Sequence, residues 1–239
     1  MALVATDVDG TLTRDGALCS EVLVAIRELA QAGVEVLPVS GRPAGEVLGL
    51  CRYLPGVRRG LAENGLLEIV PDRAPRWLGT PTEKSHLQAV GDLLNAEQGA
   101  KLELVGDDFC RLGDVAFERA GRGEPELLRL RAAARAAGVH LTWSNVHVHL
   151  AEAIPDKGAA LLQLAAESSI DPQRIVTIGD APNDAGLFVA GRFGLTVGTA
   201  AVGDQRDYFP CLPQAMTAEP EASGFLELAA ALLRARRQG

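Results

Sequence analysis

Cysteine and lysine are both scarce in this sequence of 239 residues. The four cysteines lie far apart and form neither a CxxC pair nor a cluster with histidine. Disulfide frameworks and zinc sites need ligands that are grouped more closely, so this spacing disfavours both. We therefore expect reduced thiols and a cytoplasmic location. The cysteines are Cys19, Cys51, Cys110 and Cys211.

Long apolar runs and a surplus of positive charge are also missing. No apolar run approaches the roughly 18 residues that suggest a membrane span. Asp7 falls where a secretory signal would need apolar residues, so we expect no signal peptide. The net charge of −8 disfavours nucleic acid and anionic membranes as partners, because both attract positive protein surfaces. Nothing in the sequence indicates an oligomeric state.

The composition that remains is that of an ordinary globular protein, with 47% hydrophobic and 23% charged residues. Residues 3–6 form an apolar run that stops at a polar turn, which predicts a buried strand. Residues 20–33 have apolar side chains at helical spacing, and Ser20 is placed to cap the helix start. Residues 34–39 predict a second strand, in which Pro38 marks an end or an irregularity. This order of elements predicts a parallel sheet.

The pattern changes over residues 82–153 and then returns. This stretch predicts helices over 83–97 and 124–137, a strand over 101–105 and alternating residues over 139–150, which is an α+β pattern. From Lys157 onward, helices alternate again with strands predicted at 175–178 and 195–197, and a last helix starts at Gly224. We therefore predict an α/β fold. Its doubly wound, Rossmann-like parallel core comprises residues 1–81 and 154–239, and residues 82–153 form an inserted α+β cap domain.

Polar side chains follow three of the predicted core strands. In open parallel sheets the strand ends converge at one edge, which is where ligands bind. Clustered carboxylates repel one another unless a cation lies among them, and hard oxygen ligands of this kind favour Mg²⁺. Metal, lysine and hydroxyl together are what a transferring phosphoryl group requires. The segments are Asp7-Val8-Asp9-Gly10-Thr11, Ser40-Gly41-Arg42 and Gly179-Asp180-Ala181-Pro182-Asn183-Asp184, and Lys157 joins them where the insertion returns to the core.

These four ordered motifs resemble those of the haloacid dehalogenase superfamily of phosphohydrolases. The position of the insertion, together with Glu63-Asn64-Gly65 and Asp156-Lys157-Gly158, is similar to the branch with a type IIB cap. That branch contains Cof-like sugar phosphatases, sucrose-phosphate and mannosyl-3-phosphoglycerate phosphatases and phosphoglycolate phosphatase. The resemblance implies a Mg²⁺-dependent phosphomonoesterase that acts on a small phosphorylated metabolite, such as phosphoglycolate or a sugar phosphate like mannosyl-3-phosphoglycerate.

The resemblance also implies roles for individual residues. Asp7 would attack phosphorus and form an aspartyl-phosphate, and Asp9 would act as general acid and base. Ser40 and Lys157 would bind the phosphoryl group. The implied metal ligands are the carboxylate of Asp7, the backbone carbonyl of Asp9, Asp180 and Asp184. Further expected contacts to phosphate or substrate are Gly10, Thr11, Gly41, Arg42, Asn64 and Asn183.

Two histidines in the insertion form a weaker signal. His147 and His149 alternate with apolar residues, so both rings project from the same face of a strand. Such a pair more often forms a polar face of a sheet than a metal site, and here no third ligand has the spacing of a metal site. If that face closes over the core, His147, His149 and Asn145 become candidates for substrate contact.

Other functions fit parts of the same pattern. A phosphomutase of the same branch would transfer the phosphoryl group to a sugar instead of water. A phospho-acceptor module of the receiver type also pairs early acidic residues with a lysine, but it needs an acceptor aspartate about half a domain further on. No aspartate occurs between Asp15 and Asp72, which argues against a receiver. A phosphate-binding protein without catalysis is the remaining alternative.

Overall fold

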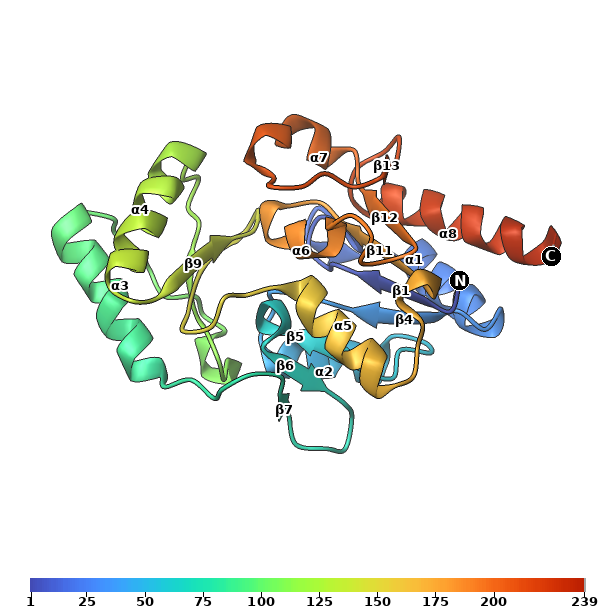
Figure 1. Ribbon diagram of the computed structural model, residues 1–239, viewed down its shortest axis with the longest axis horizontal. Coiled ribbons are helices and arrows are strands. Elements are labelled where there is room, and N and C mark those ends of the chain that lie inside the picture. Colours follow the sequence, from blue (N-terminus) through green and yellow to red (C-terminus); the bar gives the residue numbers. More distant parts are fainter. Residues whose placement is uncertain (239) are drawn as a thin grey trace.

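A five-stranded parallel sheet lies at the centre of the larger part of the molecule (Figure 1). The computed structural model describes residues 1–238. The strand order is β13-β12-β11-β1-β4, so β1 pairs with both β11 and β4. The strands are β1 (Leu3–Thr6), β4 (Glu35–Pro38), β11 (Ile175–Gly179), β12 (Leu195–Gly198) and β13 (Ala215–Met216). The residues that follow β1, β4 and β11 therefore meet at one edge of the sheet, as the α/β prediction requires.

Helices cover both faces of this sheet (Figure 1). On one face α1 (Ser20–Gln31) packs against α8 (Glu221–Gln238), and their apolar residues join one buried cluster with Val4 and Val176. On the other face α5 (Lys157–Glu167) contributes to a second cluster that contains Leu3 and Ala5. Successive β1 side chains thus enter opposite cores, which confirms the doubly wound arrangement.

Shorter elements surround the central sheet. Helix α2 (Ala44–Tyr53) follows β4, and its buried side chains belong to the same hydrophobic cluster as those of α1 and α8. The others are the hairpin β2 (Thr13–Arg14) and β3 (Ala17–Leu18), the antiparallel strands β5 (Gly60–Ala62), β6 (Leu67–Ile69) and β7 (Arg76–Trp77), the helices α6 (Ala185–Phe188) and α7 (Ala201–Asp204), and the 3₁₀ turns η1 (Glu63–Gly65), η2 (Asp108–Cys110), η3 (Pro172–Arg174), η4 (Pro182–Asp184) and η5 (Arg206–Tyr208). Within residues 1–238 no helix has the length and apolar character needed to cross a membrane.

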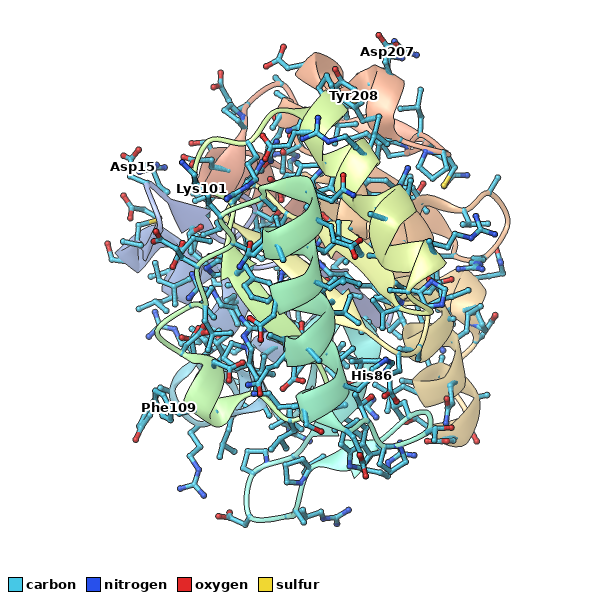
Figure 2. All side chains as sticks on the ribbon, turned by 90° about the vertical axis from the view of Figure 1, so that its left-hand side faces the viewer. Asp15, His86, Lys101, Phe109, Asp207 and Tyr208 are labelled. Carbon is cyan, nitrogen blue, oxygen red and sulfur yellow. The ribbon has the colours of Figure 1, made fainter. Side chains whose placement is uncertain are left out.

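A second, antiparallel sheet carries its own hydrophobic cluster. The strands β8 (Val115–Glu118), β10 (His147–Ala151) and β9 (His140–Trp143) pair in that order. Helices α3 (Lys84–Gln98) and α4 (Glu124–Ala136) lie on the side of this sheet that faces away from the core (Figure 1). Figure 2 views the molecule from this end, with α3 and α4 in front.

Three local predictions were wrong. Residues 101–105 are no strand, because the backbone of Lys101 is not extended (φ of 50°) and the segment pairs with β8 only through an isolated bridge from Leu104 to Phe117. Ser20 does not cap α1, because Cys19 already has the extended backbone of the cap position. Helix α8 begins at Glu221 rather than at Gly224. The expected strand end at Pro38 is observed, on the edge strand β4.

Candidate active site

Lys157 lies between two carboxylates at the edge where the central strands end. Its Nζ is 2.6 Å from Asp7 Oδ1 and 2.6 Å from Asp184 Oδ1. Asp7 follows β1, Asp184 ends the turn after β11, and Lys157 opens α5, whose start is capped by Asp156. All three charged side chains are buried. Segments that are far apart in the sequence therefore meet in one ion-pair cluster.

Asp180 lies beside this cluster and is held from several directions. Thr11 Oγ1 donates to Asp180 Oδ1 at 3.1 Å, and the backbone N–H of Asp180 donates to Asp184 Oδ2 at 2.9 Å. Asn145, at the tip of the β9–β10 hairpin, donates its amide N–H to Asp180 Oδ2. Gly10 passes directly beneath the same carboxylate. The structure thus brings Gly10, Thr11 and Asn145 together around a carboxylate.

Burial controls the electrostatics of the cluster. It raises the pKa of Asp7 to about 7, although the Lys157 ammonium opposes the rise. Burial, together with Asp7 and Asp184, raises the pKa of Asp180 well above its usual range. Burial acts to lower the pKa of Lys157, but the Asp184 and Asp7 carboxylates outweigh it and raise that pKa. Lys157 is therefore a fixed positive charge, whereas the carboxylates lack sufficient positive partners.

The missing positive charge fits a divalent cation. One oxygen each from Asp7, Asp180 and Asp184 lies within 4.8 Å of the other two. Three carboxylates and one ammonium leave two uncompensated negative charges in a buried place, which is costly unless a cation is bound. Asp184 Oδ2 accepts two backbone N–H groups and Oδ1 accepts from Lys157, so both oxygens of this carboxylate are held in place beside Asp7 and Asp180. Such oxygen donors suit Mg²⁺. The predicted ligand role of the Asp9 carbonyl stays a prediction.

Asp9 and Arg42 form a forked ion pair at the mouth of the cluster. Arg42 Nε and Nη2 each lie 2.6 Å from an Asp9 carboxylate oxygen, and Arg42 Nη1 also contacts Glu46 at 2.8 Å. The backbone N–H of Arg42 donates to Ser40 Oγ, and this places the Ser40 hydroxyl in the buried loop after β4. The two predicted motifs after β1 and β4 are thus joined directly. Arg42, predicted to contact phosphate, is engaged with carboxylates here.

Asn64 and Asn183 meet behind this loop. Asn183 Nδ2 donates to Asn64 Oδ1 at 3.0 Å. Asn64 is 2% exposed, and its Nδ2 has no hydrogen-bond partner among residues 1–238. Its backbone has a φ of 57°, a conformation that a residue other than glycine adopts at some cost. A buried amide donor is thereby held free beside the predicted site.

The two histidines of β10 differ in their surroundings. His149 is 1% exposed, and its Nδ1 lies 2.7 Å from Asp114 Oδ2. His147 is half-buried, and its ring centroid is 6.0 Å from that of His149. Burial, followed by the charges of His149, Arg111 and Arg42, lowers the pKa of His147 to about 4. The two rings therefore lie close together on β10, and Asp114 holds only that of His149.

Comparison with known proteins decides the family. A family model described as haloacid dehalogenase-like hydrolase matches residues 132–203. A phosphoglycolate phosphatase from Methanoculleus marisnigri is 30% identical over 201 residues, which cover 82% of this chain and 84% of that protein. Another, from Methanospirillum hungatei, is 28% identical over 94% of both chains. The chain belongs to the haloacid dehalogenase-like hydrolases. It is a phosphatase.

Solved structures share the fold of this phosphatase over nearly its whole length. A protein from Thermoplasma acidophilum superimposes with a TM-score of 0.79 at 20% identity and covers 97% of both chains. The sucrose-phosphatase from Synechocystis, solved with sucrose and phosphate, superimposes with a TM-score of 0.71 at 17% identity and covers 96% of both. The resemblance inferred from the motifs is thereby confirmed at the level of family and fold.

Sequence reasoning missed a buried polar network that joins the two parts of the phosphatase. The Glu63 carboxylate accepts backbone N–H groups from Ala44 in the core and from residues 112–114 next to β8. Arg111 Nη1 donates to the carbonyl of Gly41 at 3.0 Å and to Asp114 Oδ1 at 3.0 Å. Glu63 stood only as a turn residue in the sequence, and neither Arg111 nor Asp114 belongs to a recognisable motif. The one sequence signal for a buried Glu63 was its position in a short polar turn between two apolar segments.

Proposed function

We propose that this phosphatase hydrolyses small phosphate monoesters in a Mg²⁺-dependent reaction, with Asp7 as the nucleophile. The observation that carries the proposal is the position of Lys157. Its ammonium donates a hydrogen bond to Asp7 Oδ1, and Asp7 Oδ2 has no hydrogen-bond partner among the described residues. One carboxylate oxygen is thus anchored while the other is free to attack phosphorus.

The other charged groups would divide the remaining work. Asp9 lies two residues beyond the nucleophile and would protonate the leaving alkoxide, then accept a proton from the attacking water. Arg42 holds the Asp9 carboxylate in place by two hydrogen bonds. Ser40 and Lys157 would bind the phosphoryl oxygens, and these donors are already in place before the reaction, so they need little reorganisation.

Asp7, Asp180 and Asp184 would hold Mg²⁺, with the Asp9 carbonyl as a further ligand. When bound, the cation neutralises charge on the phosphoryl oxygens. Thr11 and Gly10 would keep Asp180 in place for this role. The remaining predicted contacts to phosphate or substrate are Gly41, Arg42, Asn64 and Asn183.

Residues 82–153 would act as a cap that selects the leaving group. Asn145 reaches from the cap to Asp180, and Arg111 reaches to the Gly41 carbonyl, so the cap sheet lies close above the core. Little room then remains for a leaving group, which favours a compact substrate. The identity to proteins named phosphoglycolate phosphatase makes phosphoglycolate the first substrate to test. The same identity supports hydrolysis over transfer to a sugar and over binding without catalysis.

Turnover of phosphate monoesters with and without a chelator tests the proposal. We expect the protein to hydrolyse an aryl phosphate and phosphoglycolate with Mg²⁺, and to lose this activity in chelator. Asp7→Asn should lower kcat by at least about 1,000-fold while the folded structure is kept. Asp15→Asn, at an exposed turn aspartate, is the control and should keep full activity. Retained turnover in a clean Asp7→Asn preparation would contradict the proposal.

A further inference from the structure

One side chain crosses from the proposed cap to a carboxylate of the proposed metal site. Asn145 lies at the tip of the β9–β10 hairpin. The turn there is tight, because Ser144 Oγ accepts the N–H groups of Val146 and His147. The Asn145 side chain leaves this exposed tip and donates its amide N–H to Asp180 Oδ2, on a residue that is fully buried. The hairpin thus ends in a direct contact with the core.

A second core residue fixes the orientation of the Asn145 amide. Gln205, which follows α7, donates its side-chain N–H to Asn145 Oδ1 at 3.3 Å. The amide oxygen of Asn145 therefore faces Gln205 and the amide nitrogen faces Asp180. This arrangement matches the chemistry of both partners, because an ionised carboxylate only accepts hydrogen bonds. Asn145 is thereby held between two segments of the core.

Asp180 keeps room for a cation in spite of these contacts. Its Oδ1 accepts from Thr11 and its Oδ2 from Asn145, so each oxygen has a further lone pair. Hydrogen-bond donors favour the ionised form of a buried carboxylate, which is the form that binds a metal. An amide carries no positive charge, so Asn145 stabilises this form without the repulsion that a lysine or an arginine would exert on a cation.

We propose that Asn145 is a positioning residue through which closure of the cap strengthens Mg²⁺ binding at the carboxylates of Asp7, Asp180 and Asp184. This proposal rests on the phosphatase function proposed above and deepens it, because it makes the metal site depend on both parts of the chain. By thermodynamic reciprocity, bound Mg²⁺ strengthens closure of the cap by the same factor. Metal binding and closure over the substrate are then two sides of one equilibrium.

The junction between cap and core offers a way to observe closure. Two segments without helix or strand, residues 78–83 and 152–156, connect the two parts. The backbone N–H groups of residues 112–114 donate to the Glu63 carboxylate across the junction. Separation of cap and core therefore opens these amides to hydrogen exchange. They report closure through contacts that do not include Asn145.

Titration calorimetry with Mg²⁺ tests the metal side of this coupling. Asn145→Ala should raise the Kd for Mg²⁺ about tenfold, since losing a hydrogen bond to a metal-binding side chain typically weakens metal binding about 10- to 100-fold. Val146→Ala is the matched control, because it truncates the next residue of the same exposed tip, and it should leave the Kd unchanged. An unchanged Kd in Asn145→Ala would overturn the proposal. A lower Kd would also overturn it, because Asn145 would then compete with the cation.

Hydrogen exchange tests the cap side. Saturating Mg²⁺ should slow exchange at the amides of residues 112–114 about tenfold in the unaltered protein, and less than about threefold in Asn145→Ala. Thr11→Val removes the other donor to the Asp180 side chain, which comes from the core itself. It should weaken Mg²⁺ binding too, but saturating Mg²⁺ should still slow exchange about tenfold. Loss of this slowing in Thr11→Val as well would mean that Asn145 does not link the metal to the cap.

The outcomes separate this proposal from the proposed function. An unaltered protein that binds Mg²⁺ and hydrolyses an aryl phosphate, but shows the same exchange at residues 112–114 with and without Mg²⁺, would overturn the coupling and leave the phosphatase function intact. An unaltered protein that binds no Mg²⁺ would contradict both. The exchange measurement on the unaltered protein needs no substitution, so it decides the question if Asn145→Ala does not fold.

Discussion

Gly10 lies against the carboxylate of Asp180, so closely that a Cβ atom on residue 10 would overlap Asp180 Oδ2. Its backbone also has a φ of +78°, a region that side chains disfavour. Asp180 is fixed on its other sides by Thr11 and by its own backbone N–H, so it cannot move aside freely. The glycine of the first motif is therefore required by the position of a carboxylate that lies 170 residues away in the chain.

Gly10→Ala should displace Asp180 and impair the proposed metal site. We expect activity to fall by at least about tenfold and the stabilisation by added Mg²⁺, measured as the rise in Tm, to shrink. Gly16→Ala is the matched control, because Gly16 has a φ of +76° but no atom near its Cβ position. It should lose about 1 kcal/mol of stability and keep its activity. Equal activity in the two variants would show that the overlap is harmless.

Much of this site could be predicted from the sequence, because its motifs follow strand ends. Asp7, Ser40 and Asp180 each come directly after an apolar run, and a parallel sheet brings such ends together whatever the details of packing. Lys157 could be added because it stands where the inserted segment returns to the core.

The contacts that cross between the two parts could not be predicted. Arg111 reaches the Gly41 carbonyl only because the irregular segment before β8 folds back onto the loop after β4. No periodic pattern specifies such a segment. The strand predicted over residues 101–105 failed because the backbone leaves the extended conformation at Lys101, where φ is 50°, and the segment then pairs with β8 only through the bridge from Leu104 to Phe117.

Lys157→Met should destabilise the fold as well as abolish activity. The substitution removes the only ammonium from a buried cluster, so Asp7 and Asp184 lose their shared partner. Breaking a buried ion pair on one side typically costs about 3–5 kcal/mol, which urea denaturation can measure. The control is Lys101→Met at an exposed lysine on the cap surface (Figure 2), which should unfold like the unaltered protein. A Lys157→Met variant of unchanged stability would mean that the two carboxylates are not charged together.

Glu63→Gln should loosen the junction between cap and core. Each oxygen of the Glu63 carboxylate accepts two backbone N–H groups. A glutamine would replace one of these oxygens with an NH₂ group, whose N–H bonds would then face two backbone N–H groups. We expect a loss of about 2 kcal/mol and faster hydrogen exchange at the amides of residues 112–114. Glu167→Gln, which removes an exposed ion pair with Arg76, is the control and should leave exchange at these amides unchanged. Slow exchange at residues 112–114 in Glu63→Gln would show that other contacts hold this junction.

His147 should make the fold less stable in acid. Burial and the charges of His149, Arg111 and Arg42 lower its pKa from 6.5 to about 4, so between these values the unfolded chain binds a proton that the folded protein does not. Stability that is complete above pH 6.5 is therefore lost as the pH falls toward 4. His147→Gln removes this contribution. The Tm of the unaltered protein, relative to that of the variant, should fall between pH 7 and pH 4.5 and stay constant between pH 8 and pH 9, where no imidazole titrates. A Tm difference that is the same at every pH would show that His147 binds its proton equally well in the folded and unfolded chains.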